Sequence, residues 1–105
     1  MILADTSVWV EHFRRGEPQL VRSLEAGEIL GHTYVLGELA LGRLAQRKLI
    51  LELLAALPQA VGAAEAEVLT LIESARLYGR GIGYVDAHLL AAVRLTPDAR
   101  LWTFD

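Results

Sequence analysis

Three acidic residues lie within apolar segments of this chain, and they constrain its fold more than any other feature. Asp5 follows a short apolar run at the amino terminus, Glu38 lies within the apolar segment 34–41, and Asp86 lies within the segment 83–93. Buried carboxylates are costly unless a cation or a proton compensates their charge. Because the three are far apart in sequence, we predict that folding brings them together around one shared cation.

A fourth acid, Asp105, closes the chain after the apolar residues 101–104. A site made only of carboxylates is suited to a divalent ion that prefers oxygen ligands, such as Mg²⁺. Such an ion activates water and stabilises the charge that develops on a phosphate. The residues alone therefore favour metal-dependent hydrolysis of a phosphodiester.

Composition sets the limits of this hypothesis. Residues are 53% hydrophobic and 22% charged, so a chain of 105 residues is expected to fold as one globular domain. A net charge of −3 argues against a general nucleic-acid binder, unless several acids are committed to metal ions. Cysteine is absent, which excludes disulfides and thiolate sites and fits a cytoplasmic protein. We expect no secretion signal and no membrane span, because the most apolar window, 49–57, is far shorter than the ~20 residues required.

Short apolar strands alternate with helical patterns along the chain. We predict strands over 2–5, 29–32, 60–64 and 100–104, and helices over 6–13, 18–26, around Glu38, from Leu49 to Pro58, 65–78, and from the Asp86 segment to Leu95. Strands with no polar face indicate a parallel sheet covered by helices on both sides, which is an α/β fold. Ligands of such sheets bind outside the carboxyl ends of the strands, where Asp5 and Asp105 fall.

Each acid also has a purely structural interpretation. Asp5 before Thr-Ser-Val is a favourable helix N-cap, a role compatible with metal binding. Glu38 has an alternative in a salt bridge to an arginine. Asp86 shares the helical face of residues 89, 90 and 93, and its alternative is a second N-cap. Asp105 has an alternative as a solvated chain end.

The hydroxyl and imidazole groups give weaker signals. Ser7 opens a helix and is a candidate to touch metal or phosphate. Thr103 lies two positions before Asp105 in an extended segment, on the same side, and is a candidate to hold a metal-bound water. The three histidines, His12, His32 and His88, lack metal-ligand spacing, so we expect them to be surface or half-buried residues. The glycine loop 79–83 matches no nucleotide-binding motif.

Four segments together resemble a known family. The opening Ile-Leu-Ala-Asp-Thr-Ser-Val-Trp-Val-Glu, the central Gly-Glu-Leu-Ala-Leu-Gly, the later Gly-Tyr-Val-Asp-Ala-His-Leu-Leu-Ala-Ala and the closing Leu-Trp-Thr-Phe-Asp are similar to PIN domains. The likeness is greatest to the VapC-type toxins of bacterial toxin–antitoxin pairs. It implies an α/β/α sandwich with a parallel central sheet and a Mg²⁺- or Mn²⁺-dependent endoribonuclease. It also implies an acidic quartet, assisted by Thr6 or Ser7 and by Thr103, that consists of Asp5, Glu38, Asp86 and Asp105.

The resemblance also implies partners. Members of this family commonly form homodimers, cut RNA, and are inhibited by an antitoxin protein whose tail enters the site. They usually continue by a further strand and helix beyond the last aspartate. We therefore expect residues 1–105 to form a single PIN-like domain without those two elements.

Two other functions remain open at this point. One is a PIN-fold binding protein whose metal site is degenerate. The other is a phospho-receiver module, which needs adjacent acids after the first strand and a lysine near the last strands. Here Asp5 is followed by Thr6 and Ser7, and the only lysine is Lys48. The sequence names neither the RNA that is cut nor the antitoxin.

Overall fold

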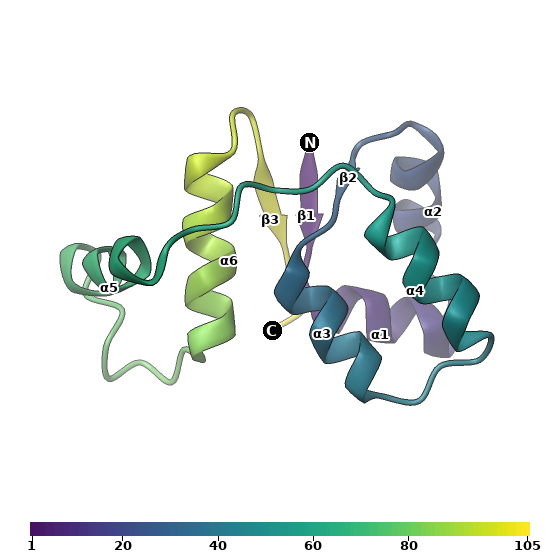
Figure 1. The fold of residues 1–105 in the computed structure, drawn as a ribbon, viewed down its shortest axis with the longest axis horizontal. Helices are drawn as coiled ribbons and strands as arrows, with labels where there is room; N and C mark the ends of the chain where they lie inside the picture. The colour runs from purple at the N-terminus through teal and green to yellow at the C-terminus, as the bar shows by residue number, and fades with distance from the viewer.

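Helices cover both faces of a three-stranded parallel sheet in the computed structural model, which describes residues 1–105 (Figure 1). The central strand is β1 (Ile2–Ala4), with β2 (Ile29–Leu30) on one side and β3 (Arg100–Trp102) on the other. In register, Leu3 pairs with Leu30 and with Leu101. The predicted α/β fold with a parallel sheet is confirmed.

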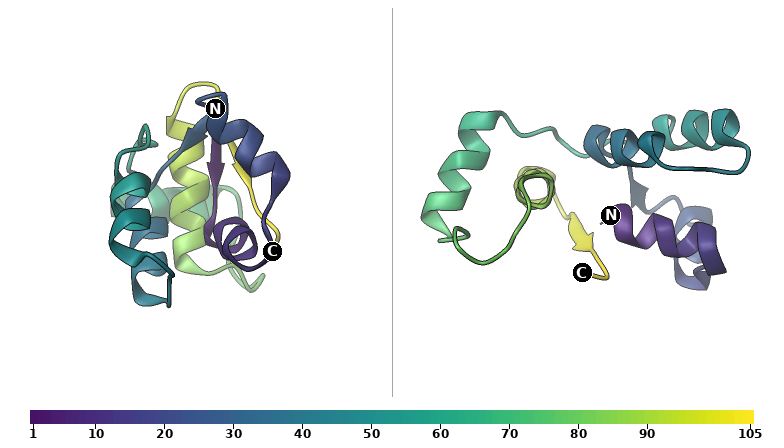
Figure 2. Two further views of the ribbon diagram at one scale, coloured as in Figure 1. Left: turned by 90° about the vertical axis from the view of Figure 1, so that its right-hand side faces the viewer. Right: turned by 90° about the horizontal axis from the view of Figure 1, so that it is seen from below.

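Six helices connect and flank the strands. In chain order they are α1 (Thr6–Arg15), α2 (Pro18–Glu25), α3 (Thr33–Leu41), α4 (Arg47–Ala55), α5 (Glu65–Ser74) and α6 (Tyr84–Leu95). Helices α1 and α2 lie on one side of the sheet, and α3, α4 and α6 lie on the other (Figure 2). None of these helices could cross a bilayer, since α6, the longest, has 12 residues.

Local signals explain where several helices begin. The carboxylate of Asp5 accepts a hydrogen bond from the backbone N–H of Val8 and caps α1. Pro18 occupies the first turn of α2, where its missing N–H costs nothing. Gly83 precedes α6 in an extended conformation, so the glycine loop leads directly into the helix that carries Asp86.

The core explains why the central strand has no polar face. Leu3 and Ala4 are fully buried between the two helical layers, together with Val8 of α1 and Leu89 of α6. Burial of such side chains contributes about 1.5–3 kcal/mol each for the larger ones. This main core fixes the positions of β1, β3 and α6 relative to one another, and therefore the positions of the residues at their ends.

Helix α5 belongs to a second, smaller cluster. Val68 and Leu71 of α5 pack on Ala87 and Ala91 of α6, apart from the main core. The ribbon shows α5 at the edge of the molecule, covering only α6 (Figure 1). The apolar spacing of the sequence predicts an inward face of Val68, Leu69, Leu71, Ile72, Ala75 and Leu77 for this helix. Leu69 and Ala75 are exposed, however, because no element covers that side of α5.

The predicted strand over 60–64 is wrong. The segment crosses from α4 to α5, and its neighbourhood contains only an isolated bridge between Gly31 and Gln59. The N–H of Val61 bonds to the side chain of Thr96 at 2.9 Å instead of to a neighbouring strand. The apolar composition of residues 60–64 suggested a strand, but no strand edge is available for this segment to pair with.

Two helices differ in detail from the prediction. Helix α5 ends at Ser74, four residues before the predicted end, since Arg76 adopts a positive φ of 53°. Helix α4 starts at Arg47, two residues before the predicted start at Leu49, and ends at Ala55; Leu49 and Leu53 are about half exposed, whereas Leu54 is buried.

Candidate functional site

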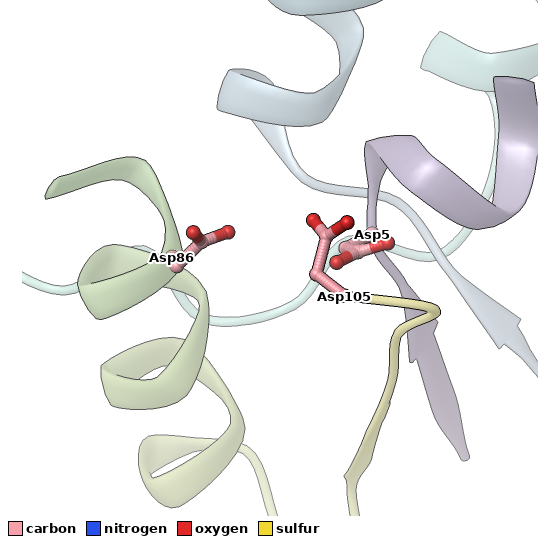
Figure 3. Close-up of side chains that lie close together, drawn as sticks. All are labelled: Asp5, Asp86 and Asp105. Atoms are coloured by element: carbon pink, nitrogen blue, oxygen red, sulfur yellow. The ribbon is translucent and has the colours of Figure 1, made fainter. Parts of the chain in front are cut away.

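Three aspartates from distant parts of the chain meet at the carboxyl edge of the sheet (Figure 3). Asp5 directly follows β1, Asp86 lies in the first turn of α6, and Asp105 follows β3. One carboxylate oxygen of each lies within 4.8 Å of the others. Asp5 is only 4% exposed, Asp86 is half-buried and Asp105 is exposed, so the cluster runs from the interior to the surface.

Glu38 faces the same cavity but stands outside this close group. The cavity measures about 460 Å³, and Glu38 lines it together with all three aspartates. Its Oε1 accepts a hydrogen bond of 2.6 Å from the hydroxyl of Thr6. No arginine pairs with Glu38, because the one ion pair of the structure joins Arg15 and Glu11. Glu38 is exposed, so the burial that its apolar sequence context indicated is wrong.

Ser7 connects Asp5 with the chain end. Its hydroxyl donates to Oδ1 of Asp5 and accepts from the N–H of Phe104 at 3.0 Å. Oδ1 of Asp5 also receives the N–H of Val8 at 3.3 Å. One oxygen of Asp5 is therefore used by the protein itself, which leaves Oδ2 for a ligand. The capping role and the site role of Asp5 coexist.

The last residues are held by further backbone contacts. The N–H of Asp5 bonds to the carbonyl of Trp102 at 3.0 Å, which extends the pairing of β1 with β3. The N–H of Asp105 bonds to the hydroxyl of Thr103 at 3.0 Å. Thr103 thus shapes the turn that carries Asp105 toward the other two aspartates.

The site carries uncompensated negative charge. No lysine, arginine or histidine lines the cavity. The pKa of Asp86 is raised above its usual value by burial, then by the charges of Asp5 and Asp105, with a smaller contribution from Glu38. A hydrogen bond from the backbone N–H of Gly83 acts in the opposite direction. A set of carboxylate oxygens without a cation fits a divalent ion that prefers oxygen ligands, such as Mg²⁺ or Mn²⁺.

Two histidines contradict the sequence-based expectation of surface or half-buried positions. His32 is 6% exposed and His88 is 3% exposed. His32 caps α3 by accepting the N–H of Tyr34 on Nδ1, and the ring of Tyr34 lies 4.6 Å from that of His88. Burial lowers the pKa of His32, and the neighbouring His88 lowers it further. The face of α6 that carries His88 is covered by Tyr34 at the start of α3.

The cavity has further lining residues that sequence reasoning missed. Tyr84, Val85 and Leu89 of α6 and Val10 of α1 form its less polar wall. Gly83 leaves little room beside Asp86, since a Cβ there would lie 3.3 Å from its Oδ2. Only the helical spacing of residues 85, 86 and 89 gave a signal for this wall.

A parallel α/β sandwich with carboxylates gathered at the carboxyl edge of its sheet is the arrangement of a PIN domain. The chain is 50% identical over 105 residues to Ribonuclease VapC32 from Mycobacterium tuberculosis, in both strain CDC 1551 / Oshkosh and strain ATCC 25618 / H37Rv. These alignments span all of this chain and 85% of each relative. The chain therefore belongs to the VapC family. No family profile matches the chain.

Proposed function

We propose that this protein is a metal-dependent endoribonuclease that hydrolyses phosphodiester bonds of RNA. The observation that carries the proposal is the meeting of three carboxylate oxygens within 4.8 Å in a cavity without a cationic side chain. Relatives named ribonuclease, identical at half of the aligned positions, support RNA as the substrate. We further propose that residues 1–105 act as a single PIN-like domain.

The proposed ion is Mg²⁺ or Mn²⁺, and each acid has a proposed role. Mg²⁺ binds oxygen in an octahedral arrangement and keeps several waters, so a few carboxylates and a substrate phosphate suffice. Asp5 and Asp86 would hold it directly, and Asp105 would contribute a third oxygen from the surface side. Glu38 acts through water or a second ion. This division follows burial and distance, because Glu38 lies outside the close group.

The hydroxyl residues act on the carboxylates in this proposal. Ser7 occupies Oδ1 of Asp5, so the direction of Oδ2 is fixed before any ligand binds. Thr6 donates to Oε1 of Glu38 and leaves Oε2 free to hold a water. Thr103 supports the turn at Asp105. These three residues therefore assist the acids at the proposed cofactor site by holding the carboxylates in position.

A bound divalent ion supplies two kinds of chemistry, a lower pKa for water and neutralisation of the charge that develops on the phosphate. The protein itself supplies the positions of the carboxylates. Preformed hydrogen bonds hold the acids in place, so little reorganisation accompanies the reaction. Glu38 at the cavity edge orients water for attack in line with the bond that breaks.

We also propose that the protein is the toxin of a type II toxin–antitoxin pair, with RNA as substrate, an antitoxin as protein partner and a homodimer as its assembly. Membership of the VapC family supports this. Exposed leucines on α3 and α4 also support a protein partner, with Leu41 91% exposed and Leu53 57% exposed. Co-purification with the product of an adjacent small gene tests the antitoxin.

Loss of a directly binding aspartate tests the enzyme. We expect Asp5→Asn or Asp86→Asn to lower cleavage of a structured RNA in Mg²⁺ by at least ~100-fold, or about 2.7 kcal/mol of barrier. Asp98→Asn is the matched control, because Asp98 is exposed in a turn with φ 59°, a conformation that asparagine also adopts. Cleavage retained by either site variant, at equal folding, refutes the assignment.

Two alternatives give different results in simple measurements. A binding protein with a degenerate site shows no heat of Mn²⁺ binding in either the wild type or Asp86→Asn. A phospho-receiver gains the mass of a phosphoryl group after incubation with acetyl phosphate and Mg²⁺. The structure disfavours the second, because Lys48 lies on α4 and does not line the acidic cavity.

A further inference from the structure

A second pocket opens directly beside the acidic cavity. It measures about 150 Å³ and shares Gly83 and Tyr84 with the cavity. It lies between the end of α5, the glycine loop 79–83 and the start of α6, and we call it the glycine-loop pocket. Its apolar walls are Ile72, Leu77, Tyr78, Ile82, Tyr84 and Ala87.

The walls of this pocket present flat apolar surface to solvent. Tyr78 is 59% exposed, Tyr84 is 48% exposed and Ile82 is 38% exposed. The ring of Tyr84 packs against His88 in an edge-to-face contact, with 4.6 Å between the ring centroids. Since His88 is buried, the orientation of Tyr84 is fixed by the core of the molecule.

The loop itself adds no bulk to the pocket. Gly79 and Gly81 have positive φ values of 71° and 75°, a conformation that glycine adopts without strain. Their place in the lining therefore leaves backbone, not side chains, next to a ligand. The pocket is therefore open to a flat group, and its shared residues Gly83 and Tyr84 place it next to the acidic cavity.

Two arginines neighbour the pocket in the sequence, Arg80 within the glycine loop and Arg76 just before the lining residue Leu77. Arg76 and Arg80 are exposed, and neither forms an ion pair. The pocket lining contains no charged side chain. An apolar slot beside two free guanidinium groups matches a ligand that has an uncharged flat part and an anionic backbone. Arginines in these positions would add nothing to the capture of an apolar peptide side chain.

We propose that the glycine-loop pocket binds one unpaired nucleobase of the RNA, next to the phosphate that is cut. This inference rests on the proposed function, because the shared residues Gly83 and Tyr84 connect the pocket with the acidic cavity. Proteins that read single-stranded RNA stack splayed bases on aromatic side chains, and such stacking tolerates different bases. Tyr78 and Tyr84 are the stacking residues, and Arg80 contacts a neighbouring phosphate.

Replacement of single bases by abasic sites tests the pocket. The substrates are ten-nucleotide single-stranded RNAs that the wild type cuts in Mg²⁺, each with one abasic position. Stacking of one base, worth about 1–3 kcal/mol, corresponds to a change of about 5- to 150-fold. We expect kcat/KM of the wild type to fall by such a factor at one position beside the cut, and by less elsewhere.

Variants of Tyr78 test whether the pocket causes the sensitivity of kcat/KM to the abasic position. We expect Tyr78→Leu to raise KM for the intact RNA by a similar factor with little change in kcat, and to lose the sensitivity to the abasic position. Tyr78→Phe retains the ring and should behave as wild type. Val21→Leu is the control for an exposed apolar substitution elsewhere, since Val21 of α2 is 39% exposed and lines neither the pocket nor the acidic cavity.

Binding measurements separate this inference from the nuclease proposal. Fluorescence anisotropy of the same labelled RNAs in Ca²⁺, which binds carboxylates with looser geometry than Mg²⁺, reports on the pocket without requiring cleavage. Weaker binding by Tyr78→Leu of single strands alone supports the pocket, even if no RNA is cut and the nuclease proposal fails. An abasic series without a sensitive position, or an equal loss for duplex RNA, overturns the pocket and leaves a cutting enzyme standing.

Discussion

Asp5 performs two tasks with one carboxylate. Oδ1 caps α1 and accepts the Ser7 hydroxyl, while Oδ2 is left for a ligand. The sequence predicted both tasks, because an aspartate that ends a buried strand and precedes Thr-Ser satisfies the rules for each. Glu38 was harder to predict. Its helix and cavity are as expected, but the position of its carboxylate depends on Thr6, a contact that sequence spacing does not reveal.

The charge of Asp86 leads to a prediction about stability. Without metal, Asp86→Asn should be more stable than the wild type at pH 7 by about 1 kcal/mol, a typical effect of one substitution. Burial and the neighbouring aspartates raise the pKa of Asp86, so the folded state binds a proton more readily than the unfolded state. Wild-type stability is therefore lost as pH rises from 3.8, the ordinary value, through the raised pKa of Asp86.

Urea unfolding in a chelator, followed by circular dichroism between pH 4 and pH 7, measures this difference. The advantage of Asp86→Asn should shrink as the pH is lowered. Asp98→Asn should show no comparable pH-dependent gain, because Asp98 is exposed and lies outside the cluster. A site variant that is less stable than wild type at pH 7 contradicts the assignment of uncompensated charge.

At the scale of elements, the sequence predicted the positions of the helices well, but it predicted less well which faces of those helices are buried. The apolar residues of 60–64 suggested a strand, but strand formation also requires a free partner edge, which the sequence does not show. The inward face predicted for α5 was too wide. Leu71 is 8% exposed, whereas Leu69 is 56% exposed, because α6 covers only one side.

This one-sided packing predicts that α5 can loosen independently of the sheet. Leu71→Ala should destabilise the protein by about 2 kcal/mol, the lower end for a buried leucine, because the site is near the surface. Leu69→Ala, on the exposed side of the same helix, should change the free energy of unfolding by less than about 0.5 kcal/mol. Amide hydrogen exchange should show faster exchange in α5 of Leu71→Ala and unchanged protection in β1. Equal loss of protection in both elements contradicts an independent α5.

At the scale of the whole molecule, the parallel sheet brings distant residues together. Strand order β2-β1-β3 places the ends of β1 and β3 side by side, and α6 packs on the same edge. The alternation of strands and helices allowed this edge to be predicted. The depth of each acid in the cavity was not predictable, since it depends on how α1, α3 and α6 pack against one another.

A ligand that binds only the folded state raises its stability. Mg²⁺ or Mn²⁺ at about 100 times its dissociation constant should stabilise the protein by ~2.7 kcal/mol, which corresponds to an increase of several degrees in Tm. The shift should be absent or much smaller in Asp5→Asn. Differential scanning fluorimetry checks this, with NaCl at equal ionic strength as the control. An equal shift in Asp5→Asn, or in NaCl, argues against a metal centre at this edge.

The hydroxyl of Ser7 is shared between Oδ1 of Asp5 near the start of the chain and the amide of Phe104 near residue 105. A single small side chain thus couples the innermost acid of the cluster to the outermost one. A protein that binds the terminal residues and displaces Phe104 would therefore also alter the hydrogen bond between Ser7 and Asp5, the most buried acid of the cluster.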